Sequence, residues 1–312
     1  MKITRSVLIP SLIFILTATS ISTKAQQLPL YSGYMFNMLE INPAYAGYRN
    51  SIQFTSSFRK QFNGIKNSPQ TATASFDMPV GDTNVGIGVR IMDDRFSVSK
   101  TQGIQSAYSY KIQTGESSLL YMGLQAGILT YKANLTDLQT ADFNDPIFAN
   151  DSRSLVANFG AGLFFSTEKF YAGVSVPNFI RTNLHPGNFA TTANEVKQAF
   201  HGYLNAGYTA YLNDNFVLKP SFLVRAVKGL PLQYDVNANV FFRELVAGGV
   251  SYRSNSAVVL LLNFKVNYQF SVGYSYDYNT SRLNNFNKGT HEIMLRYQIP
   301  FWKDEPLPSY LF

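Results

Sequence analysis

Beyond residue 50, apolar and polar residues alternate along most of this chain. In the segment 289–299, for example, Ile293, Leu295, Tyr297 and Ile299 share one face, and the intervening positions are mostly polar. A period of two places successive side chains on opposite faces of a β-strand. The pattern therefore predicts an all-β chain whose strands each have one apolar and one polar face.

Fourteen segments carry this pattern: 52–62, 68–78, 83–92, 101–112, 118–131, 155–166, 169–177, 198–212, 215–228, 231–241, 245–253, 256–265, 267–278 and 289–299. Their lengths of about 9 to 15 residues exceed the roughly 5–6 residues that are typical of strands in soluble sheets. A strand that crosses a bilayer at a tilt needs about 9–11 residues. Length and alternation together predict a single closed antiparallel transmembrane β-barrel of about 14 strands, spanning residues 51–299.

The connections between these segments fall into two alternating sets. One set is uniformly short: 79–82, 113–117, 167–168, 213–214, 242–244 and 266. The other set contains the long connections: 93–100, 132–154, 178–197 and 279–288. Short periplasmic turns and longer external loops are typical of outer-membrane barrels. This interpretation places both the N- and C-termini on the periplasmic side.

The charged residues of the strands occupy the polar phase and are expected to line the lumen. They are Arg59, Arg90, Arg225, Asp235, Arg253, Asp277, Glu292 and Arg296. An arginine on the lipid face near the bilayer centre costs about 2–4 kcal/mol, so the polar face must point inward. Open sheet edges are excluded from lipid, so the sheet must close. Charges of both signs could fill the interior with salt bridges or line a watery channel, and the sequence does not choose.

The first residues predict a cleaved signal peptide, residues 1–25. Lys2 and Arg5 precede an apolar run over 7–16, and small residues follow up to Ala25. The apolar run is shorter than the roughly 20 residues of a membrane-spanning helix. The chain has no cysteine, which excludes both a lipid anchor on cysteine and disulfides.

Two further segments lie outside the strand pattern. Residues 26–50 combine Pro, Asn and Gly with several aromatic residues and no alternation. We expect this segment to pack under or inside the barrel on the periplasmic side, as a plug or a docking segment. The tail 300–312 contains Pro306 and Pro308, and we expect it to be presented to periplasmic partners.

Composition alone leaves a soluble domain and a membrane barrel both open, and it argues against nucleic-acid binding. Charged residues make up 14% of the chain, against about 25% in soluble domains. Removal of the signal peptide takes away Lys2, Arg5 and Lys24, which lowers the net charge from +7 to +4. The remaining basic residues are scattered rather than gathered on one face, so no nucleic acid partner is expected. A soluble β-sandwich or propeller is the structural alternative, and strand length and the signal peptide argue against it.

The sequence carries no catalytic, cofactor or metal motif. His291 and Glu292 begin like a zinc-protease motif, but Leu295 stands where the second histidine is required. The loop 137–151 holds Asp142, Asn144 and Asp145, whose oxygens could bind calcium, but it lacks the spacing and glycine of an EF-hand, which favours a solvated acidic loop. Glycine pairs such as Gly86 with Gly88 and Gly160 with Gly162 lie within strands, where we interpret them as relief of crowding on the inner face. We expect no enzyme activity.

A series of short motifs occurs in order along the chain. They are Tyr34-Met35-Phe36-Asn37, Asn42-Pro43-Ala44-Tyr45-Ala46-Gly47, Arg59 with Gln61, Pro177-Asn178, Gly273-Tyr274-Ser275-Tyr276-Asp277 and Gly289-Thr290-His291-Glu292. In their number and order the chain resembles the PorP/SprF family of type IX secretion system membrane proteins. One departure is Phe62, which stands where the family has Trp.

The resemblance implies an outer-membrane location in a Bacteroidetes-type bacterium and a role in exporting adhesins and enzymes, including motility adhesins in gliding species. It implies contacts with outer-membrane lipids, with periplasmic ring and peptidoglycan-linked components, and with secreted cargo or adhesin C-terminal domains. It transfers no catalytic residue and no cofactor. The long connections 132–154 and 178–197 would then face the cargo outside the cell. The alternative function is a passive porin-like diffusion channel for small solutes.

Overall fold

The structure is a computed structural model that describes residues 31–138, 150–179 and 200–300. Within these ranges the chain is almost entirely β-strand, with short 3-10 helices. None of the described helices has the length and apolar character needed to cross a membrane.

Fifteen antiparallel strands occur in the described residues. They are β1 (Ser51–Lys60), β2 (Gln70–Pro79), β3 (Val85–Phe96), β4 (Ser99–Gly115), β5 (Ser118–Ala133), β6 (Ser152–Ser166), β7 (Phe170–Asn178), β8 (His201–Tyr208), the two-residue β9 (Ala210–Tyr211), β10 (Phe216–Val227), β11 (Gln233–Phe242), β12 (Val246–Arg253), β13 (Ala257–Lys265), β14 (Phe270–Asn279) and β15 (Thr290–Pro300).

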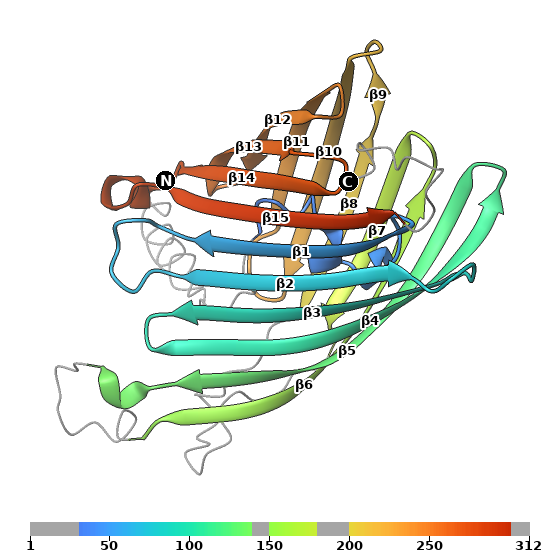
Figure 1. Cartoon of the computed structure of the whole chain (residues 1–312). Helices are drawn as coiled ribbons and strands as arrows, with labels where there is room; N and C mark the ends of the chain where they lie inside the picture. The colour runs from blue at the N-terminus through green and yellow to red at the C-terminus, as the bar shows by residue number, and fades with distance from the viewer. Residues whose placement is uncertain (1–30, 139–149, 180–199, 301–312) are drawn as a thin grey trace, which may run out of the picture.

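The sheet closes on itself, as Figure 1 shows with β1 lying between β15 and β2. The first and last strands pair over their whole length, from Ser51 opposite Pro300 to Lys60 opposite His291. Strand β10 pairs with β8 on one side and β11 on the other. The predicted closed antiparallel barrel of about 14 strands is therefore confirmed, with β9 as a short extra strand beside β10.

Two predicted elements differ in the structure. The predicted strand 198–212 is divided into β8 and β9 at Thr209. The break falls next to the position opposite Pro220 of β10, which has no backbone N–H to donate to the ladder.

The prediction of a long loop over 93–100 is wrong. Strands β3 and β4 continue to Phe96 and from Ser99, and only Ser97 and Val98 form the turn, with Ser97 at φ 54°. The outward-facing residues of β3 change from apolar to charged at Asp93, so the apolar alternation ends before the strand does.

The two ends of the barrel are named here by their connections. The loop side carries the connections β1–β2, β3–β4, β5–β6, β7–β8, β10–β11, β12–β13 and β14–β15, and the turn side carries the others. Around the wall, large apolar side chains such as Leu124, Leu155 and Leu262 point outward and are exposed. Polar side chains point inward and are buried. This inside-out arrangement suits a wall surrounded by lipid.

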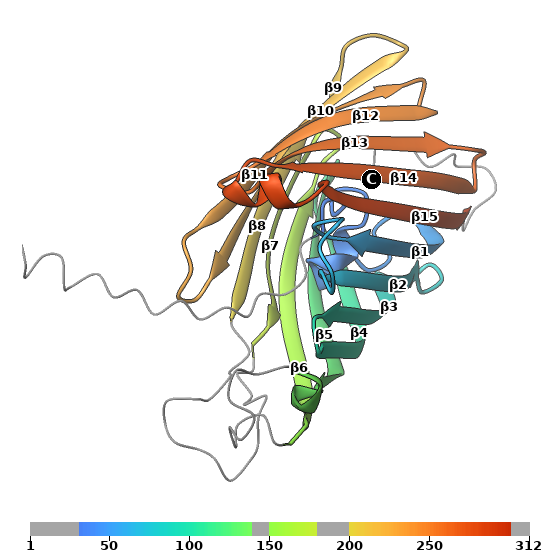
Figure 2. The same ribbon diagram turned by 90° about the vertical axis from the view of Figure 1, so that its left-hand side faces the viewer.

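Residues 31–50, called the plug below, lie inside the barrel (Figures 1 and 2). The plug contains two 3-10 helices, η1 (Met38–Glu40) and η2 (Pro43–Tyr45). Asn42 begins η2 as its N-cap, because its side chain accepts a hydrogen bond from the Ala44 N–H at 3.0 Å. Pro43 follows at the first helical position, where its missing N–H costs nothing.

Candidate functional site: the plugged lumen

The plug runs from the loop side to the turn side of the barrel. Ser32 contacts Asp277 and Glu292, which lie near the loop-side ends of β14 and β15. Gly47 lies against Met78 and Gly86, at the turn-side ends of β2 and β3. The described chain therefore begins at the loop side, whereas β15 ends at the turn side.

Five charged residues of the wall form an interior cluster near the loop side. Arg59 pairs with Asp277 at 2.7 Å and with Glu292 at 3.0 Å. Arg253 pairs with Asp235 at 3.1 Å and with Asp277 at 3.3 Å. All five side chains are at least 96% buried. Such a buried network stabilises the fold only while its members stay paired and hydrogen-bonded.

The start of the plug completes this cluster. The backbone N–H groups of Ser32 and Gly33 donate to the two carboxylate oxygens of Glu292, at 2.9 and 3.1 Å. The Ser32 hydroxyl donates to Asp277 at 2.8 Å and accepts from Arg59 at 2.9 Å and from Arg253 at 3.2 Å. The interior cluster contains three carboxylates but only two arginines. The hydrogen-bond donors of the plug therefore help to satisfy its excess of negative charge.

A second ion pair holds the middle of the plug. Glu40 of η1 binds Arg90 of β3 at 2.8 Å, and Arg90 also donates to the Glu40 backbone carbonyl at 2.8 Å. Thr73 of β2 and Asn37 of the plug donate to the other Glu40 oxygen, at 3.0 and 3.3 Å. Both carboxylate oxygens of Glu40 are thus engaged by donors.

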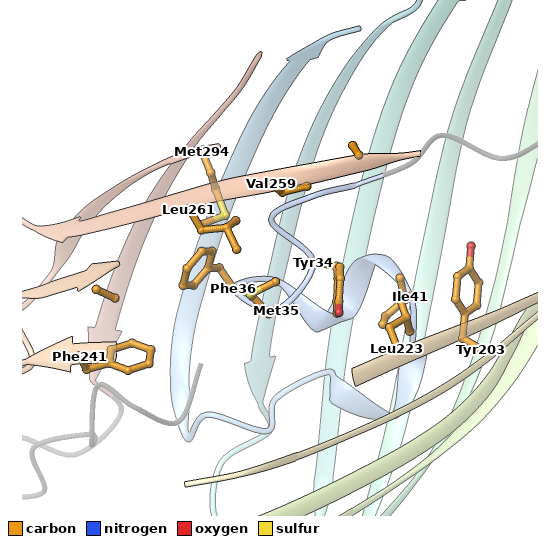
Figure 3. Packing of buried hydrophobic residues seen from close by; sticks show 12 residues of the cluster. Tyr34, Met35, Phe36, Ile41, Tyr203, Leu223, Phe241, Val259, Leu261 and Met294 are labelled. Atoms are coloured by element: carbon orange, nitrogen blue, oxygen red, sulfur yellow. The ribbon is translucent and has the colours of Figure 1, made fainter. Parts of the chain in front are cut away.

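Apolar packing joins the plug to the opposite wall. Figure 3 shows Tyr34, Met35 and Phe36 of the plug among buried wall residues that include Leu223, Phe241, Val259, Leu261 and Met294. The Tyr34 hydroxyl accepts a hydrogen bond from Asn237 at 2.6 Å. Burial raises the pKa of Tyr34, so this hydroxyl stays protonated.

Aromatic rings pack the turn-side part of the plug. Tyr45 and Tyr48 contact Phe164 of β6 edge-on, at centroid distances of 5.4 and 5.0 Å. Tyr48 also meets Tyr121 of β5 edge-on at 5.2 Å. Edge-to-face contacts of this kind add to the energy of apolar burial.

Glycines of the wall allow η2 to lie directly against the strands. A Cβ at Gly123 of β5 would stand 2.1 Å from the Ala44 backbone nitrogen, and one at Gly162 of β6 would stand 2.1 Å from the Asn42 side-chain oxygen. The Asn42 side chain donates to the Leu163 carbonyl at 2.9 Å. The plug therefore needs glycine at these two positions of the wall.

The residues singled out in the sequence are distributed as follows. Asn37, Asn42, Pro43, Ala44, Tyr45 and Gly47 belong to the plug. Arg59, Asp235, Arg253, Asp277 and Glu292 meet in the interior cluster, whereas Arg90 lies apart with Glu40. Arg225 and Arg296 are buried in the lumen outside the cluster. Pro177 and Asn178 lie at the loop-side end of β7, and Gln61 directly follows the loop-side end of β1.

Tyr276 and His291 lie outside the lumen. Both face outward on β14 and β15, with ring centroids 5.2 Å apart, and the Tyr274 hydroxyl lies 2.7 Å from His291 Nδ1. They neighbour Asp277 and Glu292 in sequence but point the opposite way because the strand alternates its faces.

The sequence interpretation missed Ser32 and Glu40. Glu40 carried a usable signal, since it is the only acidic residue of the segment 26–50. A lone carboxylate in a segment expected to enter an arginine-lined lumen indicates an ion pair with the wall.

The site consists of ion pairs, hydrogen bonds and packed rings that retain a segment of chain. Among the described residues no group of three or more His, Cys, Asp or Glu is placed to hold a metal ion. Asp142, Asn144 and Asp145 of the acidic loop lie outside the described residues, as does 180–197 of the second long connection.

The sequence of this chain matches a known protein family. The family model described as "Type IX secretion system membrane protein PorP/SprF" matches residues 23–297. No curated protein sequence matches the chain.

Several solved barrels are similar in fold at low identity. The Ralstonia pickettii toluene transporter TbuX is 9% identical, with 86% of this chain and 93% of that chain covered and a TM-score of 0.48. A Pseudomonas aeruginosa FadL homologue is 12% identical, with 89% and 96% covered and a TM-score of 0.45. The KdgM porin is 9% identical, with 79% and 99% covered and a TM-score of 0.40. These likenesses concern the barrel fold alone.

Proposed function

Because this chain belongs to the PorP/SprF family of type IX secretion system membrane proteins, we propose that it is a non-enzymatic outer-membrane component of that system. Its barrel supports the export or the surface attachment of cargo proteins such as adhesins. In a gliding bacterium the cargo includes motility adhesins.

The observation that carries this proposal is the plugged lumen. The plug contacts the wall by hydrogen bonds to the interior cluster near the loop side, by the Glu40–Arg90 ion pair in the middle, and by aromatic packing at the turn side. A passive diffusion channel needs a continuous watery path. A plug held at three levels favours a structural and interaction role over the porin alternative.

The lengths of the connections support an orientation of the barrel in the membrane. We place the turn side in the periplasm and the loop side outside the cell, as in other outer-membrane barrels. Pro300, at the turn-side end of β15, then leads into a periplasmic tail that contacts ring and peptidoglycan-linked components. The long connections 132–154 and 178–197 meet cargo, because they belong to the loop side. Tyr31 lies at the loop side, and residues 26–30 lie outside the described residues.

Copurification tests the proposal in a bacterium with its own type IX system. Wild-type protein extracted in mild detergent should bring down both periplasmic components and secreted cargo. A variant truncated after Pro300 should lose the periplasmic components and keep the cargo. A variant in which a short Gly-Ser linker replaces 180–199 should do the reverse. Recovery of neither class with wild-type protein counts against the secretion role.

A further inference from the structure

A row of basic side chains crosses the outward face of the barrel near its loop-side end. Arg95 of β3 lies opposite Lys100 of β4, Lys100 lies opposite Lys132 of β5, and Lys132 lies opposite Arg153 of β6. These four residues, the basic row, therefore stand side by side on four adjacent strands. Neighbouring strands are about 4.8 Å apart, so the four charges form one continuous band.

The row of aligned polar residues continues toward the β1–β15 pairing that closes the barrel, called the seam below. Gln70 of β2 lies opposite Arg95 and also opposite Lys60 of β1, and Lys60 lies opposite His291 of β15. The band thus extends across β3 to β6 and, through a polar glutamine, to the outward lysine and histidine at the seam.

The basic row lies just beyond the apolar belt. The last large apolar residues that face outward before it are Ile91, Ile104, Ile128 and Leu155, all exposed on the outer wall. Each lies two or four residues along its strand from the basic residue, and therefore on the same outward face. A charge at the hydrocarbon centre is costly, whereas long basic side chains are favourable at the headgroup level.

Acidic side chains offset only part of this charge. Asp93 pairs with Arg95 at 2.7 Å and with Lys100 at 3.2 Å. Asp151 accepts hydrogen bonds from Thr136, and Asp137 accepts one from Asn134, so both are engaged in the β5–β6 connection. Arg95 remains 62% exposed.

The two ends of the barrel differ in charge among the described residues. Outside the lumen, and counting only residues whose side chains the structure describes, the loop-side strand ends and connections carry eight basic side chains, Lys60, Lys66, Arg95, Lys100, Lys132, Arg153, Lys228 and Lys288, and three acidic ones, Asp93, Asp137 and Asp151. The turn side carries four basic side chains, Lys111, Lys169, Arg243 and Lys265, and five acidic ones, Asp82, Glu116, Glu168, Asp214 and Glu244. The excess of positive charge is confined to the loop side.

We propose that the basic row binds the phosphate groups of lipid A, the phosphorylated glycolipid of the outer leaflet, around the strands β3 to β6. The row faces lipid rather than the lumen, lies at headgroup depth and presents charges at regular spacing. Clusters of Lys and Arg at the membrane surface recognise anionic headgroups in this way. The assignment to the outer leaflet rests on the orientation proposed above, in which the loop side faces outward.

Binding of purified lipids to the full-length barrel in detergent micelles tests this assignment. Bisphosphorylated lipid A, dephosphorylated lipid A and phosphatidylglycerol are titrated separately, and retained lipid is counted by native mass spectrometry. The wild-type barrel should bind bisphosphorylated lipid A at least about tenfold more tightly than either other lipid. Equal binding of the dephosphorylated form contradicts phosphate recognition, and equal binding of phosphatidylglycerol contradicts the choice of lipid A.

Two variants matched in charge locate the site. Arg95→Gln with Arg153→Gln removes two charges of the basic row, and Lys169→Gln with Arg243→Gln removes two charges from the turn side. The first pair should weaken binding of bisphosphorylated lipid A about tenfold, and the second by less than about twofold. Heat-modifiable mobility on gels verifies that each variant is folded. Equal affinity in the two folded variants overturns the proposal.

Discussion

Glu292 of the last strand accepts the backbone N–H of Ser32 at 2.9 Å, although 260 positions separate the two residues in the chain. Glu292 also lies directly opposite Arg59 of β1 in the register that closes the barrel, and pairs with it. The plug is therefore attached at the seam itself. Barrel closure and retention of the plug depend on the same buried charges.

Glu292→Gln should destabilise both the barrel and the plug. The substitution removes one charge from a buried network and leaves Arg59 with a single carboxylate partner, Asp277. Breaking a buried ion pair from one side typically costs about 3–5 kcal/mol, and the retained amide and the second partner bring the expected loss to about 2–3 kcal/mol. Urea unfolding in detergent, followed by circular dichroism or gel mobility, measures it.

Glu116→Gln serves as the matched control, because Glu116 is exposed in the β4–β5 turn. The control should change the free energy of unfolding by less than about 0.5 kcal/mol. Equal stability of the Glu292 and Glu116 variants would show that the interior cluster does not hold the seam.

Alternation predicted the barrel because lipid enforces it. Outward residues such as Leu155 and Leu262 meet hydrocarbon, inward residues such as Arg253 meet the lumen, and each strand repeats the rule. The alternation ends where the strands leave the lipid. For this reason the sequence predicts a long connection over 93–100, where the structure has the ends of β3 and β4. In this part of β3 the strand continues, but its outward-facing residues are charged instead of apolar.

The interior cluster was predictable only in part. Inward arginines and carboxylates follow from their phase in each strand, but which of them meet depends on the register across β11, β12, β14, β15 and β1. The alternation of apolar and polar residues could not predict the path of the plug, because residues 31–50 have no such period. The two contacts of the plug with Glu292 are made by the backbone N–H groups of Ser32 and Gly33, which leave no side-chain signal in the sequence.

Glu40→Gln should loosen the middle of the plug and raise the conductance of the barrel. The variant removes the charge that pairs with Arg90, so the arginine is left facing the lumen with weaker neutral partners. In planar bilayers the wild-type barrel should be nearly silent, and the variant should show brief openings with at least about fivefold greater mean current.

Asp214→Asn is the control for conductance, because Asp214 lies exposed in a turn-side connection. It should remain as silent as the wild-type barrel. A large steady current through the wild-type protein would instead support the porin alternative and contradict a closed plug.

The absence of cysteine allows a direct test of the position of the plug. The Asn37 side chain donates to the Ser75 hydroxyl at 3.1 Å, so Asn37→Cys with Ser75→Cys places one thiol on the plug and one on the neighbouring position of β2. Oxidation should close an intramolecular disulfide, detected as a reductant-sensitive mobility change of the denatured protein. In the control, Ser56→Cys replaces Ser75→Cys; Ser56 faces outward on β1, so no such shift should appear.

Gly162→Ala should hinder entry of the plug, because the new Cβ would stand 2.1 Å from the Asn42 side-chain oxygen. The strand and η2 cannot both keep their places, and overpacking of this kind costs about 1–3 kcal/mol. Gly248→Ala on β12 is the matched control, since the nearest atom to its Cβ, in Leu262, is 4.0 Å away. Urea midpoints of the two variants give the comparison.

Adding Asn42→Ala to Gly162→Ala tests the cause of that loss. Shortening Asn42 removes the clashing oxygen, but it also removes the N-cap of η2, which is worth about 1 kcal/mol. If the clash dominates, the double variant should be less destabilised than the sum of the two single variants, with a coupling of about 1 kcal/mol or more. Simple additivity would mean that Gly162 matters for the strand itself rather than for the fit of the plug.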